Sequence, residues 1–280
     1  MSPHPRPVTG LAAGGRIGAI DVTWEHAPWE PLVDHYAVHA ATTRDVATTP
    51  DTLIGTTVYG RITHDTLGPE AQTRYYRVVT VDASGRRSSP SAVVGATSTE
   101  SLVVAGEPIA TVGEFDSKSL ELALAPSRGQ SRFRDAFPDG VDFTYGSSDP
   151  AADWCYLHPG PEDGWGGERE HTFRLRFDLE EAPGSGLGVV IWLIDTHASR
   201  PGTARLAVND APAGEIAFRR GATRGSLEGD ATVPGTALVP SFVEPVLDAA
   251  LFRAGQNTLD ITKSDGSWHA YDAVGVFRPS

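Results

Sequence analysis

The sequence is poor in lysine and has no long apolar run. Only two of its 23 basic residues are lysine, Lys118 and Lys263, and 36 acidic residues give a formal net charge of −13. Nonspecific binding to nucleic acid and to anionic membranes both draw on Lys and Arg charges, so this balance argues against either partner. No apolar stretch approaches the roughly 18 residues that span a bilayer.

Several further absences limit the possible chemistry. Cys155 is the only cysteine, so no intrachain disulfide can form, and no motif around it indicates a catalytic thiolate. The first residues, MSPHPRPVTGLAAGG, lack a charged region followed by an apolar run, so we expect no secretory signal in this chain. GxSxG, HExxH and a phosphate-binding glycine loop are absent, which excludes common hydrolase, zinc-protease and nucleotide-binding motifs.

What the sequence does contain is frequent turns, with 30 glycines and 21 prolines between short apolar segments. In the first hundred residues this spacing is typical of an antiparallel sandwich. Ile20, Val22 and Trp24 alternate with polar or small residues, which predicts that they face inward. We expect strands near residues 17–24, 34–41, 53–58, 61–66, 75–82 and 91–97.

The same region resembles a fibronectin type III module over residues 5–98. The resemblance is carried by PVTGLAA, by DVTW with Trp24, by DHYAVHA with Tyr36, and by LGPEAQTRYYRVVTVDASGRRSSPS. It implies a β-sandwich that serves as a spacer or a protein-contact unit. We therefore assign residues 1–98 to a fibronectin type III-like domain, 99–108 to an extended linker and 109–280 to a second domain.

The second domain is also predicted to be all-β. In HTFRLRFDL the apolar residues alternate strictly with polar ones, which predicts one buried face, whereas LGVVIWLID is apolar throughout and should form a central strand. A short helix is expected over 246–254. The expected strands are 140–146, 171–179, 187–195, 204–209, 214–220, 257–263 and 269–277. The predicted architecture is a β-sandwich of jelly-roll type.

The stretch between Phe143 and Leu179 has the densest set of aromatic and imidazole groups, set among Gly, Pro, Asp and Ser. Long ordered loops are often functional, and a sugar ring offers apolar C–H faces that a flat aromatic side chain can cover. We therefore predict a sugar-binding surface formed by Trp154, Tyr156, His158 and Trp165, with Trp268 and His269 from the last hairpin. The alternative is that the tryptophans only fill the end of a sandwich.

The second domain resembles a known family through several motifs. VGEFDSKSLELAL at 112–124, FTYGSSDPAADWCYLHP, HTFRLRFDL, ARLAVND, RGSLEG at 224–229, AGQNTLDI at 254–261 and YDAVGVF are similar to the carbohydrate-binding-like C-terminal domain of rhamnogalacturonan lyases, polysaccharide lyase family 4. The resemblance implies a galactose-binding-like jelly roll and a secreted, plant-cell-wall context with an acidic polysaccharide as partner. It also implies that catalysis belongs to an upstream domain, so no catalytic residue is assigned here.

Two further sets of residues follow from this context. Arg219, Arg220 and Arg224 are candidates to bind a uronate, since the net charge of −13 would otherwise repel an acidic polymer; Arg224 could equally be structural at a strand end. Galactose-binding-like sandwiches often hold calcium, which requires oxygen ligands. The candidate calcium ligands are Asp116, Asp149, Asp153 and Asp272. Alternatively, Asp149 caps a turn and Asp272 bonds within the last strand. No other cofactor is expected.

Three functional interpretations remain open from the sequence. The leading one is a non-catalytic carbohydrate-binding accessory protein. The second is a polysaccharide lyase or glycoside hydrolase whose active site is in the jelly-roll loops, which would require residues 143–171 and 265–272 to form a deep cleft with perturbed carboxylates. The third is a structural spacer or protein-interaction module, which burial of Trp154 and Trp165 would favour.

Overall fold

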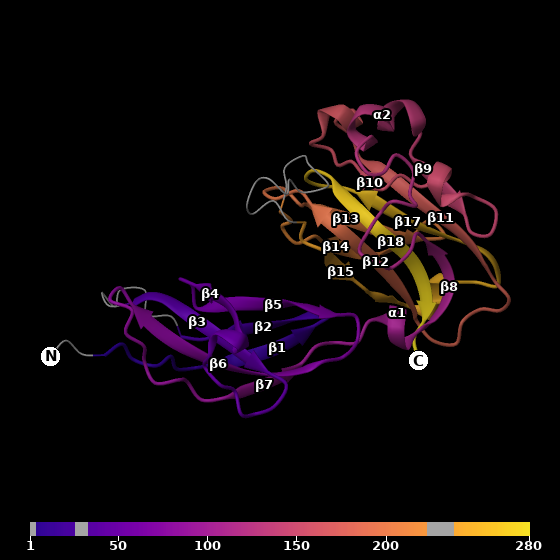
Figure 1. Ribbon diagram of the computed structural model, residues 1–280. Coiled ribbons are helices and arrows are strands. Elements are labelled where there is room, and N and C mark those ends of the chain that lie inside the picture. Colours follow the sequence, from indigo (N-terminus) through magenta and orange to yellow (C-terminus); the bar gives the residue numbers. More distant parts are fainter. Residues whose placement is uncertain (1–3, 26–32, 223–237) are drawn as a thin grey trace. The chain divides into compact units, whose positions relative to one another are not determined.

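The computed structural model describes residues 4–25, 33–222 and 238–280. They belong to two compact units, Met1–Val104 and Ala105–Ser280, and strands dominate both (Figure 1). Within the described ranges, no helix has the length and apolar character needed to cross a membrane. The predicted all-β fold class is confirmed.

The first unit is a two-sheet antiparallel sandwich. Its strands are β1 (Ala12–Arg16), β2 (Gly18–Thr23), β3 (Val33–Ala41), β4 (Leu53–Thr57), β5 (Arg61–Gly68), β6 (Thr73–Asp82) and β7 (Val94–Thr97), with a 3-10 turn η1 (Pro50–Thr52) before β4. One sheet has the order β1-β2-β5 and the other β4-β3-β6-β7. Strand β1, with the sequence AAGGR, was not expected, because it has no apolar alternation and forms by pairing with β2.

The core of the first unit lies between these sheets. Ile20, Val22 and Trp24 are buried on one side, as their alternation predicts, and Tyr36 and Val38 meet them from the other sheet. The rings of Trp24 and Tyr36 pack edge to face with centroids 5.3 Å apart. The inward face predicted for this strand is therefore confirmed.

The expected extended linker has structure of its own. The short helix α1 (Leu102–Ala105) falls within residues 99–108, and strand β8 (Glu107–Val112) begins before that range ends. Strand β8 forms there because it pairs antiparallel with the C-terminal strand β18 (His269–Arg278) of the second unit.

The second unit packs a six-stranded sheet on a five-stranded one. Its remaining strands are β9 (Val141–Thr144), β10 (Leu157–His158), β11 (His171–Leu179), β12 (Leu187–Thr196), β13 (Thr203–Val208), β14 (Ala211–Ala217), β15 (Ser241–Val243), β16 (Val246–Leu247) and β17 (Gly255–Lys263). The first sheet runs β10-β18-β12-β15, with β16 beside β12 and β8 beside β18; the second runs β14-β13-β17-β11-β9. Their facing side chains form one apolar core.

The two strand patterns with the clearest predictions are confirmed. In β11, Phe173, Leu175 and Phe177 are buried while the alternate residues reach solvent, and β12 is buried along its whole length. In contrast, the helix expected over 246–254 is wrong. There the chain forms β16, which pairs with β12, and then the single 3-10 turn η3 (Ala249–Leu251).

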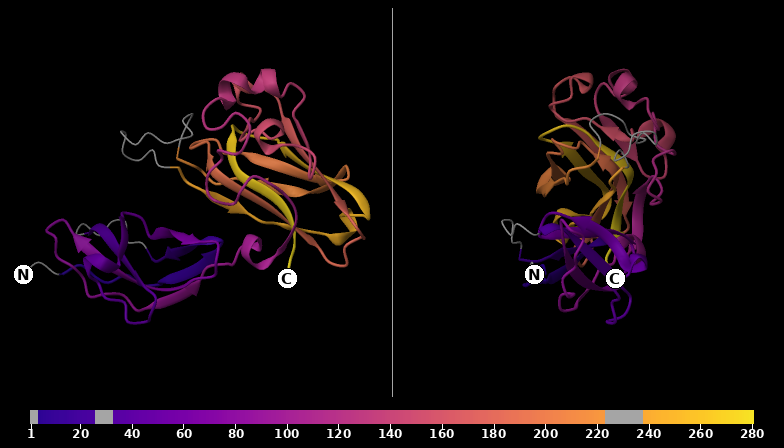
Figure 2. Two further views of the ribbon diagram at one scale, coloured as in Figure 1. Left: turned by 45° about the vertical axis from the view of Figure 1, so that its right-hand side comes forward. Right: turned by 60° about the vertical axis from the view of Figure 1, so that its left-hand side comes forward.

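Two short helices and a turn cover one end of this sandwich. They are α2 (Gly129–Ala136), α3 (Pro150–Asp153) and the 3-10 turn η2 (Gly164–Gly166). Figures 1 and 2 show α2 beyond the ends of the sheets, close to β9 and β10. At the start of α2, a Cβ atom on Gly129 would lie 2.8 Å from Leu157 Cδ2, so this close approach of helix to sheet requires glycine.

Candidate functional site

The aromatic residues predicted to form a sugar-binding surface are almost all buried. The prediction that they form a surface is therefore wrong. Trp154, Tyr156, His158, Trp268 and His269 are each 0–1% exposed. The cause is β10, whose Leu157 and His158 pair with Ala270 and His269 of β18 and draw the segment into the six-stranded sheet. A buried ring cannot offer its face to a sugar. Of the six predicted residues, only Trp165 remains partly exposed.

These rings instead fill the end of the sandwich, as the alternative interpretation of the tryptophans stated. Trp154 packs edge to face on Phe173 and Tyr271, with centroids 5.4 and 5.5 Å apart. The His158 ring stacks on Phe173 at 3.8 Å. The predicted surface is therefore a structural core, and such contacts add to the apolar area that the rings bury.

His158 belongs to a buried chain of hydrogen bonds that links the Tyr271 hydroxyl to the backbone of His171. Its Nε2 donates to the His171 carbonyl oxygen and its Nδ1 accepts from the Tyr271 hydroxyl, both at 2.8 Å. Burial lowers the pKa of His158 and of His269 well below their ordinary values, so both rings are neutral. Lys263 is also buried and donates from Nζ to the Pro201 carbonyl.

Of the three arginines predicted to bind a uronate, the structure describes two. Arg219 and Arg220 are exposed residues that follow β14. The Arg219 carbonyl accepts a hydrogen bond from Thr196 Oγ1. Arg224 lies outside the described residues. The role predicted for the three together therefore stays a prediction.

The four candidate calcium ligands fall into two separate pairs. Asp116 and Asp272 both accept from the Lys118 backbone N–H, at 2.9 and 2.8 Å. Asp149 caps α3 by accepting from Ala151 N–H, which is the alternative role expected for it, and Asp153 accepts from the Asp149 N–H. In the part of the chain that the structure describes, no three His, Cys, Asp or Glu side chains gather as a metal site requires. The predicted four-ligand set is therefore not assembled.

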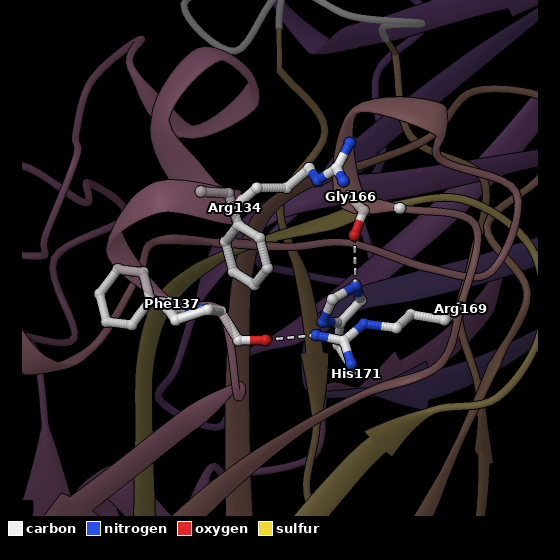
Figure 3. A pocket seen from close by; sticks show the side chains of 8 residues that line it. Arg134, Phe137, Gly166, Arg169 and His171 are labelled. Atoms are coloured by element: carbon white, nitrogen blue, oxygen red, sulfur yellow. Dashed lines mark hydrogen bonds between the residues drawn. The ribbon is translucent and has the colours of Figure 1, made fainter.

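A pocket of about 320 Å³ lies beside this buried core, between α2 and the turn η2. That volume is at the lower end of the range for small-molecule sites. Figure 3 shows the Arg134 and Arg169 side chains at the pocket, with Phe137 and His171 also lining it. The residues that line it are Phe133, Arg134, Phe137, Pro138, Gly166, Gly167, Arg169 and His171. No carboxylate is among these described lining residues.

Helix α2 is held over the sheet by one buried ring. Phe133 is fully buried and stacks parallel to Phe173 with centroids 6.2 Å apart. The edges of Trp165 and His171 meet it at near-perpendicular angles, 6.1 and 5.0 Å away. Because Arg134 is the next residue along the helix, this anchor fixes where its guanidinium can reach.

The opposite wall is built by a tight turn. The Asp163 carbonyl accepts the backbone N–H groups of Gly166, Gly167 and Glu168, at 2.9, 3.1 and 3.1 Å. Gly167 has a left-handed φ of 100°, which favours glycine. A Cβ atom on Gly166 would lie 2.6 Å from Pro159 Cβ, so this position also requires glycine.

The two arginines differ in how far they are fixed. Arg169 donates from Nη2 to the Pro138 carbonyl across the pocket, as Figure 3 shows. Arg134 is exposed, and its Nε lies 3.9 Å from where a Cβ atom of Gly167 would be. Neither guanidinium forms an ion pair with a carboxylate in the described ranges. The pocket therefore holds two positive charges that remain available to an anion.

His171 forms the floor of the pocket. Its Nε2 donates to the Gly166 carbonyl at 2.8 Å. Burial lowers the pKa of His171 and the nearby Arg169 lowers it further, while the bond to Gly166 and the charge of Asp163 act in the opposite direction. The neutral ring therefore carries its proton on Nε2, because a carbonyl can only accept.

Sequence reasoning found half of this pocket. Gly166, Gly167, Arg169 and His171 lie in the stretch expected to be functional, although none of the four was assigned a binding role. Helix α2 was missed because its sequence, GQSRFRDA, contains one large apolar residue and so gives no helical periodicity. For this half of the pocket, the only signal in the sequence was Arg134, which directly follows the single large apolar residue, Phe133.

Comparison with known families matches residues 108–276 to the family described as "CBM-like: Polysaccharide lyase family 4, domain III". This range covers more than half of the chain. No curated protein matches the chain.

Similar solved structures include a human FNIII domain, an α-L-rhamnosidase from Dictyoglumus thermophilum and a family 35 carbohydrate binding module from an environmental isolate. Their identities are 18%, 12% and 14% and their TM-scores 0.28, 0.31 and 0.26. The matches cover 36%, 100% and 40% of this chain, and 85%, 29% and 70% of those proteins. With TM-scores below 0.5, these likenesses say nothing of function. The resemblance predicted for the second domain is confirmed by the family match. FNIII domains are also among the similar solved structures.

Proposed function

Because the chain belongs to the CBM-like domain III family of polysaccharide lyase family 4, we propose that it is a non-catalytic protein that binds acidic, pectin-type polysaccharides. In this proposal the second unit binds the glycan in the pocket between α2 and η2. The first unit serves as a spacer, and catalysis belongs to a separate lyase domain. An extracellular setting follows from the nature of the substrate.

The observation that carries the proposal is the pair of arginines at the pocket. Arg134 and Arg169 bring two positive charges together on a chain whose formal net charge is −13. A guanidinium can donate two parallel hydrogen bonds to one carboxylate, which gives both strength and orientation. A local positive site of this kind lets an acidic polymer approach a protein that repels it elsewhere.

The rest of the pocket suits a sugar ring. Phe137 and Pro138 supply apolar surface, and sugar-binding sites combine such surface with a few fixed polar groups. The described residues that line the pocket include no pair of carboxylates for acid and base catalysis, and the one imidazole among them already donates to the Gly166 carbonyl. These features support binding over the lyase or hydrolase alternative.

Calorimetric titration with trigalacturonate and with a neutral oligosaccharide of equal length tests the proposal. We expect wild type to bind the acidic ligand more tightly, and added salt to weaken that binding. Arg134→Gln should lower the affinity by roughly ten- to a hundredfold, because a hydrogen bond to a charged group contributes about 1.5–3 kcal/mol. Arg132→Gln is the matched control, since Arg132 is an exposed arginine of the same helix outside the pocket.

Two outcomes would contradict the proposal. If folded wild type binds no acidic glycan across a broad panel, the spacer interpretation takes its place; burial of Trp154 already agrees with that interpretation. If purified protein releases unsaturated uronides or new reducing ends from rhamnogalacturonan above a heat-killed control, the chain is an enzyme.

A further inference from the structure

We propose that His171 is a third anion-binding group of the pocket, neutral when the pocket is empty and protonated when an acidic sugar is bound. This inference rests on the proposed function, because it concerns the same pocket and the same class of ligand. Its consequence is that glycan binding takes up a proton, so that affinity increases as the pH falls.

The position of His171 supports this role. The residue lines the pocket floor together with Arg169, and Figure 3 shows its ring at the pocket with Nε2 bonded to the Gly166 carbonyl. Nε2 carries a hydrogen in both protonation states, because the carbonyl can only accept. Nδ1 has no hydrogen-bond partner in the described ranges. A second proton can therefore join Nδ1 without breaking the bond that fixes the ring.

The charges around His171 explain why an anion would be needed. Burial is the largest cause of the lowered pKa of His171, and the positive charge of Arg169 lowers this pKa further. Arg134 lines the same pocket and adds a second positive charge. Asp163 acts in the opposite direction, but its carboxylate already accepts from Ser267 Oγ at 2.6 Å and from Gly160 N–H at 2.8 Å. A carboxylate ligand bound between the two arginines would offset their repulsion.

The groups behind the ring do not supply that charge. His158 donates to the His171 carbonyl oxygen and is held neutral by burial. Lys263 is the register partner of His171 in β17 and is itself buried. Both are basic, so neither can stabilise an imidazolium at His171. The carboxylate of the bound ligand is therefore the group that makes protonation of Nδ1 favourable.

Calorimetry measures the proton directly. Trigalacturonate is titrated into the full chain at pH 6 in buffers of different ionisation enthalpy, and the dependence of the binding enthalpy on the buffer gives the number of protons taken up. We expect uptake of a substantial fraction of one proton with trigalacturonate and none with the neutral oligosaccharide. Affinity for the acidic ligand should rise by up to about tenfold per pH unit between pH 7 and pH 5.

A variant assigns the proton to a residue. His171→Gln keeps an N–H group that can donate to the Gly166 carbonyl but cannot titrate, and Arg132→Gln is again the control. Folded His171→Gln should bind trigalacturonate with no proton uptake, and Arg132→Gln should behave as wild type. Uptake that persists in His171→Gln would place the proton elsewhere and overturn the inference.

The wild-type measurement also stands without the variant. Tight binding of trigalacturonate with no buffer dependence would overturn the role of His171 and leave the proposed function intact. Absence of binding would overturn both.

Discussion

Burial moves the pKa values of two groups toward neutrality, in opposite directions. Asp272 is a buried carboxyl in β18, and burial raises its pKa from 3.8 to about 7. Lys263 is a buried amine in β17, and burial lowers its pKa from 10.5 to about 7. Each difference between folded and unfolded chain makes the free energy of unfolding depend on pH.

The free energy of unfolding of wild type should fall as the pH rises from 4 to 7, and Asp272→Asn should remove this fall. In that window the folded chain holds a proton on Asp272 that the unfolded chain releases, so the free energy of unfolding falls as pH rises, by up to about 1.4 kcal/mol per pH unit. Urea denaturation of wild type and variant across the window measures the difference between their slopes. Asp210→Asn is the control, because the Asp210 side chain is 90% exposed. Equal slopes in wild type and Asp272→Asn would contradict the prediction.

Lys263→Met should change the slope in the alkaline range. Between pH 7 and about 10 the unfolded chain carries a proton on Lys263 that the folded chain lacks. The free energy of unfolding of wild type should therefore rise with pH, again by up to about 1.4 kcal/mol per unit, and the variant should lack that part of the rise. Lys118→Met is the natural control, because Lys118 is the other lysine and is largely exposed. The prediction fails if Lys118→Met and Lys263→Met change the slope alike.

Among the secondary-structure elements, α2 depends most on a single side chain. Phe133 is its only large buried residue, and three aromatic rings and His171 surround it. Arg134 directly follows Phe133 in the chain. The Phe133 side chain therefore both packs α2 and positions the wall of the pocket. The geometry of the binding site is therefore linked to the stability of α2.

Phe133→Ala should destabilise the second unit by about 3–5 kcal/mol, the usual cost of emptying a buried aromatic site. It should also weaken glycan binding, because α2 would no longer hold Arg134 in place. Denaturant unfolding and calorimetry of the same samples measure the two effects. Leu120→Ala, at a residue that is 66% exposed, should stay within about 0.5 kcal/mol of wild type. A folded Phe133→Ala variant with unchanged stability would contradict the account of the anchor.

Strands were predictable where one residue type alternates with another. His171–Leu179 alternates strictly and Leu187–Thr196 is apolar throughout, and both are strands with the expected burial. Val246–Ala254 also has apolar residues at spacings that suit a helix, but pairing of β16 with β12 overrides this local preference. The periodicity of apolar residues indicates which face of an element is buried. It does not indicate which strand lies beside that element.

The site was harder to predict than the fold for a related reason. Trp154 and His158 lie among Gly, Pro and Asp, a composition typical of an exposed loop, yet β10 joins β18 and both side chains are buried. Burial of a loop depends on contacts far away in the sequence, which composition does not encode. Arg134 and Arg169 are 35 positions apart and line one pocket because Phe133 packs α2 against Trp165 of the turn η2.

At the scale of the whole molecule, the described residues form two hydrophobic cores that share no residue. One is formed by residues between Val8 and Ala96 and the other by residues between Ile109 and Val276. A core of its own is the usual condition for a domain to fold alone. The pocket and its arginines depend only on the second core, so a fragment with that core should retain the binding site.

The fragment Ala105–Ser280 should therefore fold cooperatively when expressed alone, and bind trigalacturonate with the affinity of the full chain. Circular dichroism during urea denaturation measures the first property and calorimetry the second. Phe133→Ala provides an internal control, because its cost in the fragment and in the full chain should agree within about 0.5 kcal/mol if the cores are independent. A fragment that is unfolded while the full chain is folded would show that the second core needs the first unit. A folded fragment that loses binding would instead place part of the glycan site outside residues 105–280.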